Sequence, residues 1–200
     1  MNPAGFERSA KDSAQAEGNI SARVKASFDR VAFRCRRFAG EEIGPQRILE
    51  LQAKAASQGD LTAEIDIFSQ AAPLHPDGPS FSDERRILLM QRALASRDPT
   101  AIAAMASLMG VTARPGFAGS MPAGSLRSEA AWNLAACQLG MDCGPSSSLV
   151  VSACVFGGIC GFNSVADLYS RGLLPLSETP YLNKEILLVV NGAAQHGNNQ

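Results

Sequence analysis

The sequence predicts an all-α fold of short antiparallel helix pairs, solenoid-like in its arrangement, with a disulfide-stapled helical section towards the C-terminus. Apolar residues recur at helical spacing through most of the chain, and recognisable cap residues bound these segments. No segment has a convincing strand pattern. The chain has 200 residues and is 46% hydrophobic, which is enough to form a sizeable core.

The first predicted helix covers residues 20–38. Its apolar positions step by four and three along one face: Val24, Phe28, Val31, Cys35 and Phe38. We expect this stripe to be buried, with Cys35 as a buried free thiol. Residues 1–18 have the composition of a disordered or flexible segment, and residues 1–22 lack the apolar region of a signal peptide.

Four further helices are predicted before residue 110. Their starts are marked by a first-turn proline or by an N-cap side chain: Pro45, Asp60, Ser82 and Asp98. The prolines of residues 71–80 interrupt this series, and Gly110 ends it. The segment 111–125 is rich in glycine and proline and is predicted to be a loop.

Four helices are also predicted after this loop. Their expected ranges are 126–139, 146–156, 164–172 and 179–194. The second of them is rich in β-branched residues, which leaves a strand as its alternative. We therefore expect a helical-repeat-like region over 19–110 and a cysteine-containing helical region over 126–196, joined by the loop into one continuous domain, 19–196.

Two segments of the first region resemble each other. "KAASQGDLTA" (54–63) aligns with "RALASRDPTA" (92–101) at an offset of 38 residues. Asp60 and Asp98 then occupy the same turn, in front of the second helix of each pair. A helix–turn–helix unit that recurs at this period is typical of a solenoid.

The turn of the first copy resembles the Sel1-like branch of the tetratricopeptide-type repeats. The matching residues are Lys54, Ala55, Ala56, Gly59, Asp60 and Ala63. The second copy departs from the pattern, because Leu94 replaces an alanine and Arg97 replaces the glycine. The resemblance covers about residues 42–110. It implies an α-solenoid-like scaffold for protein–protein contacts and transfers no catalytic residue.

Four of the five cysteines form a C-x5-C-x10-C-x5-C pattern: Cys137, Cys143, Cys154 and Cys160. This spacing is too wide for a zinc knuckle or for a redox C-x-x-C motif, although a structural zinc site stays an alternative. Gly140 and Gly157 can reverse the chain after each helix. We therefore favour disulfides within each pair, with the crossed pairing as the rival.

Two candidate contact sites for a partner stand out. The first is the basic cluster of Arg34, Arg36 and Arg37, for which a solvated helix face is the alternative. The second is Trp132, the single tryptophan, which is either a binding hot spot or a packing anchor. No catalytic, cofactor-binding or metal-binding residue is assigned.

The predicted function is a non-enzymatic helical scaffold that binds a protein or peptide. The alternatives are a hydrolase-type enzyme with an unrecognised site and a small zinc protein. A net charge of −1 gives no argument for nucleic acid, no apolar run is long enough for a membrane span, and no cofactor motif is present. Disulfides indicate a periplasmic or secreted protein, whereas a native start at Met1 would favour the cytoplasm.

Overall fold

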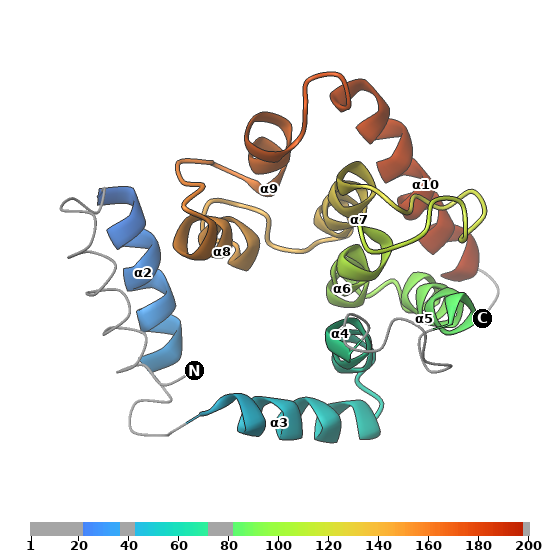
Figure 1. Ribbon diagram of the computed structural model, residues 1–200, viewed down its shortest axis with the longest axis horizontal. Helices are drawn as coiled ribbons and strands as arrows, with labels where there is room; N and C mark the ends of the chain where they lie inside the picture. Colours follow the sequence, from blue (N-terminus) through green and yellow to red (C-terminus); the bar gives the residue numbers. More distant parts are fainter. Residues whose placement is uncertain (1–21, 37–42, 72–81, 198–200) are drawn as a thin grey trace. The chain divides into compact units, whose positions relative to one another are not determined.

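The computed structural model describes residues 22–36, 43–71 and 82–197. All regular structure within these ranges is helical (Figure 1), and the all-α prediction is confirmed. The α-helices are α2 Ala22–Cys35, α3 Pro45–Ser57, α4 Leu61–Ala71, α5 Asp83–Ser96, α6 Pro99–Met109, α7 Leu126–Gln138, α8 Ser148–Gly157, α9 Val165–Asp167 and α10 Thr179–Gly197. The predicted flexible segment 1–18 and nearly all of 71–80 lie outside the described residues.

The predicted N-caps form as expected. An Asp60 oxygen accepts a hydrogen bond from the amide of Ala63 at 2.9 Å, and Ser82 caps α5 in the same way. Asp98 accepts hydrogen bonds from both the amide and the hydroxyl of Thr100. Each cap satisfies an amide that the first helical turn leaves without a partner.

The segment for which a strand was the alternative is helical. α8 begins after Ser147, whose hydroxyl accepts from the amide of Val150. The predicted helix from Ser164 consists of α9 followed by a π-helical segment, η3 Leu168–Leu173. None of the described helices is long and apolar enough to cross a membrane.

The chain divides into two compact units. The first combines the described parts of residues 1–51 with residues 142–168, and the second combines residues 52–141 with 169–200. This division differs from the predicted boundaries near residues 110 and 125. The physical reason is that α8 packs against α2, which lies far from it in the sequence.

The second unit has α6 and α7 at its centre. α6 contacts α4, α5 and α7, and α10 contacts both α5 and α7 (Figure 1). Six of the thirteen residues of α7 are alanine, tryptophan or leucine with at most 7% exposure, and Ser128 and Asn133 are buried as well, so α7 is buried on nearly all sides. The return of α10 to α5 closes this bundle, and the solenoid-like arrangement stays a prediction.

An ion-pair network joins α7 to α10 inside this unit. The Arg127 guanidinium pairs with Glu185, at 2.6 Å from Nε to Oε1, and also with Glu178. The two carboxylates raise the pKa of Arg127 against the lowering effect of partial burial. The guanidinium also lies over the ring of Tyr181, 5.4 Å from its centroid.

The two segments that align at an offset of 38 residues, 54–63 and 92–101, share their turn geometry. Gly59 has φ +93° and Arg97, at the equivalent position, has φ +54°. Both residues have a left-handed backbone conformation, and each directly precedes the N-cap aspartate of the next helix. The side chains of Thr62 and Thr100, also one offset apart, bring their Oγ1 atoms within 3.2 Å.

This shared turn gives a matched pair of stability predictions. Arg97→Gly is expected to stabilise the chain by about 0.5–1 kcal/mol, because glycine adopts the left-handed conformation without a steric penalty. Gly59→Ala is expected to destabilise it by about 1 kcal/mol, although a Cβ there meets no atom within 4 Å. Urea unfolding measures both changes. A stabilising Gly59→Ala would contradict the argument from backbone conformation.

Candidate binding site

The first unit contains a cavity of about 280 Å³ between α2 and the segment that carries α8. Its walls come from two parts of the chain that are distant in sequence, α2 and the segment 145–163. The lining residues are Ala26, Ser27, Arg30, Pro145, Val150, Cys154, Gly161, Phe162 and Asn163. The cavity therefore combines apolar side chains with a guanidinium, a hydroxyl, a backbone carbonyl and an amide.

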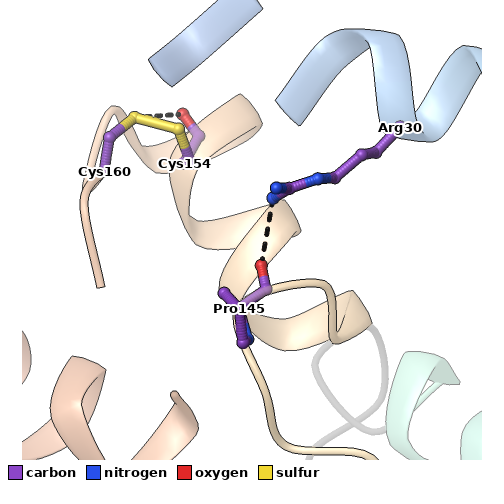
Figure 2. Close-up of a disulfide and its surroundings, with 4 residues drawn as sticks. All are labelled: Arg30, Pro145, Cys154 and Cys160. Atoms are coloured by element: carbon purple, nitrogen blue, oxygen red, sulfur yellow. Dashed lines mark hydrogen bonds between the residues drawn. A yellow bond between two sulfur atoms is a disulfide. The ribbon is translucent and has the colours of Figure 1, made fainter. Parts of the chain in front are cut away.

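Two arginines of α2 hold the turn that precedes α8. Arg30 Nη1 donates to the carbonyl oxygen of Pro145 at 3.2 Å (Figure 2), and Arg34 Nη2 donates to the carbonyl oxygen of Ser146. The two residues are four apart, so both side chains leave the same face of the helix. The carbonyl oxygens of Pro145 and Ser146 precede α8 and thus accept their hydrogen bonds from charged guanidinium groups. Hydrogen bonds from charged donors are stronger than hydrogen bonds from neutral donors.

α8 supplies the opposite wall. Its inner side is apolar, and Val150, Val151 and Cys154 are buried. The helix ends at Gly158, which is left-handed with φ +67°. The amides of Gly158 and Ile159 both reach the carbonyl oxygen of Ala153. The chain then reverses and brings Cys160 back beside Cys154.

A disulfide fixes this reversal. Cys154 and Cys160 are bonded, with 4.4 Å between their Cα atoms (Figure 2). Gly161, Phe162 and Asn163 follow directly and line the cavity. The disulfide therefore anchors one wall at the end of α8. The residue that takes the left-handed conformation is Gly158, so the expectation for Gly157 was wrong: Gly157 belongs to the helix.

The other two cysteines of the pattern, Cys137 and Cys143, are disulfide-bonded as well. The bond between Cys154 and Cys160 excludes the crossed pairing. All four sulfurs are thus oxidised and offer no thiolate to zinc. Within the part of the chain that the structure describes, no cluster of three or more metal-ligating side chains exists.

Cys35 is free, as predicted, but its side chain is half-buried. Phe28 and Val31, on the predicted apolar stripe of α2, are half-buried too, and Ser27 is the buried residue among the side chains described in this helix, 25–35. The expectation of a buried stripe was therefore wrong for these described positions. α8 meets α2 on the side that carries Ser27 and Arg30.

The predicted partner-contact residues have different surroundings. Arg34 binds the turn before α8, whereas Arg36 lies over the ring of Phe33, 4.0 Å from its centroid. Arg37 lies outside the described residues. Trp132 is fully buried in the second unit, and its Nε1 donates to the carbonyl oxygen of Pro122 at 3.0 Å. The structure thus gives Trp132 the role of a packing anchor.

The cavity itself was not predicted from the sequence. Arg30 lies off the predicted apolar stripe, and no role was predicted for it. A weak signal existed: Ala26, Arg30 and Arg34 share one helical face through their spacing of four. This spacing does not predict which helix packs against α2, because a local sequence pattern carries no information about a helix more than a hundred residues later.

A second polar cluster lies inside the other unit. Asn133 Nδ2 donates to the hydroxyl oxygen of Tyr169 at 2.9 Å, and that hydroxyl lies 3.4 Å from Glu129 Oε1. Burial raises the pKa of Glu129, and the hydrogen bond from Tyr169 opposes this. Burial and the nearby Glu129 carboxylate raise the pKa of Tyr169. These side chains satisfy one another and stabilise the contact between α7 and η3.

The raised pKa of Glu129 predicts a pH-dependent effect. The Glu129 carboxyl has a higher pKa in the folded state than in the unfolded state, where its pKa is about 4.5. Its contribution to stability is therefore fully present when the pH is below 4.5, and it is lost as the pH rises through the pKa of the folded state. Glu129→Gln stays neutral and keeps an acceptor for Tyr169. We expect the variant to be more stable than the wild type at pH 7, with the gain shrinking towards pH 4.

Urea unfolding at both pH values measures this difference. Glu84→Gln is the matched control, because Glu84 is exposed and its substitution should change stability by at most about 0.5 kcal/mol. An equal effect of Glu129→Gln at pH 4 and pH 7 would mean that the buried charge has no cost.

Comparisons with protein-family models, with curated proteins and with solved structures give no match to this chain.

Proposed function

We propose that this chain is a non-enzymatic helical scaffold that binds a peptide or protein partner, and that the cavity between α2 and α8 receives a segment of that partner. The observation that carries the proposal is the mixed lining of this cavity. Binding sites for small segments are concave and mostly apolar, with a few polar groups that fix orientation. Val150 and Phe162 supply apolar surface, and Arg30 and Asn163 supply polar groups.

The lining residues favour binding over catalysis. Ser27 is the only hydroxyl-bearing side chain among them, and no histidine, aspartate or glutamate belongs to the set. Nucleophilic catalysis by serine requires an adjacent base, which these residues do not supply. The resemblance of the repeat turn to Sel1-like proteins gives further support, because such scaffolds act in protein–protein contacts.

The disulfides support a location outside the reducing cytosol. Two disulfide pairs within one short region persist in oxidising compartments, and we therefore propose a periplasmic or secreted protein. In that setting the bond between Cys154 and Cys160 keeps the cavity wall in place before a partner arrives. A wall that is already ordered lowers the entropic cost of binding.

Selection from two random peptide libraries displayed on phage, one with free N-termini and one with free C-termini, tests this proposal. The oxidised full-length chain is the bait, and the same chain with Ala26→Leu is the matched control. Leucine at position 26 would fill the cavity and is compatible with the helix. We expect a consensus sequence that binds the wild type with micromolar affinity and binds Ala26→Leu at least about tenfold more weakly. Failure to enrich any consensus on the folded wild type would contradict the proposed function.

A further inference from the structure

We propose that the cavity between α2 and α8 recognises the C-terminal residue of a partner peptide, with its free carboxylate on Arg30 and an apolar side chain against Val150 and Phe162. This inference rests on the proposed function and names the chemistry of its ligand. It is carried by the charge, the shape and the lining of the cavity.

The charge of the lining favours an anion. Arg30 is the one charged residue among the lining residues. A guanidinium has five N–H donors, and one hydrogen bond to the carbonyl oxygen of Pro145 leaves the others for a ligand. The nearby acids are engaged elsewhere: Asp29 pairs with Lys25 at 2.8 Å, and Asp167 accepts a hydrogen bond from the amide of Asn163.

The same lining also requires an apolar group. Val150 is buried, Phe162 is half-buried, and Cys154 of the disulfide also lines the cavity. Val150 and Cys154 are already buried, so a ligand with a charge alone would leave the exposed part of Phe162 facing water. A volume of about 280 Å³ lies just below the usual range for small-molecule sites, about 300–1,000 Å³. It therefore suits one or two amino-acid residues.

A C-terminal residue with an apolar side chain meets both requirements in the smallest space. Its carboxylate and its side chain are attached to the same Cα atom, so the guanidinium and the apolar wall are reached together. An internal aspartate or glutamate places its charge at the end of the side chain and brings no apolar group beyond it. Capture of a terminal carboxylate is an established mode of peptide recognition.

Fluorescence anisotropy with short labelled peptides tests the inference on the oxidised full-length chain. The consensus selected from the libraries is synthesised with a C-terminal leucine, once as the free acid and once as the amide. We expect the free acid to bind at least about tenfold more tightly than the amide. A tenfold change in affinity matches the free energy that a hydrogen bond to a charged group contributes. Replacement of the terminal leucine by aspartate is expected to weaken binding, because the apolar wall stays uncovered.

Two substitutions assign the effect to its residues. Arg30→Gln should remove the preference for the free acid, and circular dichroism checks that the helices are retained. Arg47→Gln is the matched control, because it removes one positive charge from an exposed pair with Glu50 and does not line the cavity; the preference should persist. N-acetyl-leucine as a competitor separates a free small acid from a peptide. Complete competition at equal concentration would assign the site to small acids and overturn the peptide proposal.

Three negative results would have different consequences. Equal binding of acid and amide by the wild type would overturn the inference about the carboxylate, while the proposed peptide-binding function would stand. An unchanged acid preference in Arg30→Gln would overturn the role of Arg30. Absence of any selected peptide would overturn the proposed function itself.

Discussion

Trp132→Ala is expected to destabilise the second unit by about 3–5 kcal/mol, the usual cost of removing a large aromatic side chain from a core. Trp132 is fully buried. Its indole N–H donates to the carbonyl oxygen of Pro122 at 3.0 Å, so the substitution also leaves a buried carbonyl without its donor. The cost is a large fraction of the stability of an ordinary domain.

Urea unfolding followed by circular dichroism measures this effect, since the variant lacks the only tryptophan. Trp132→Phe is a milder variant that keeps part of the ring volume and should fall between Ala and the wild type. Leu176→Ala is the control, because Leu176 is 84% exposed and should change stability by at most about 0.5 kcal/mol. A Trp132→Ala variant as stable as Leu176→Ala would show that the tryptophan is not part of the core.

The double substitution Cys154→Ala and Cys160→Ala is expected to destabilise the first unit by about 2 kcal/mol. This is the chain-entropy value for a disulfide that closes a loop of this short length. The sequence separation of the two cysteines is 6 residues. Because the residues that follow Cys160 line the cavity, we also expect the affinity for the selected peptide to fall.

Hydrogen exchange of the amides of α8 measures the stability change locally, and fluorescence anisotropy measures the affinity. The matched control is Cys35→Ala, which removes a free thiol and should leave peptide binding unchanged. If the double variant bound the peptide as tightly as the wild type, the disulfide would have no part in holding the wall of the cavity.

Local rules were sufficient for most of the helices. Ser82 and Asp98 were recognised as caps because the hydrogen bond of an N-cap is made within three residues, and the structure places both at the helix starts. The disulfide between Cys154 and Cys160 was predictable for the same reason, because it joins residues across a single chain reversal. The left-handed residue was misplaced by one position, since Gly157 and Gly158 are equally suited by sequence.

The candidate site depends on long-range packing and was therefore missed. Arg30 and Pro145 are 115 residues apart, and no local periodicity specifies such a pair. The apolar stripe of α2 was expected to mark its buried side, yet Ser27 is buried while Phe28, Val31 and Cys35 are only half-buried. α2 contacts α8, and Arg30 and Arg34 bind the turn at Pro145 and Ser146, so the side of α2 that faces α8 carries polar contacts that the apolar stripe does not predict.

Mapping of a bound peptide on the full-length, oxidised chain tests directly whether the cavity between α2 and α8 binds a peptide. Two-dimensional ¹H–¹⁵N NMR spectra, recorded as the selected free-acid peptide is added, report which amides sense the ligand. If the peptide binds in this cavity, the largest shifts are expected at Ser27, Arg30, Cys154 and the segment 161–163. Shifts confined to the second unit, or a bound peptide that leaves the amides of these lining residues unperturbed, would contradict binding in this cavity.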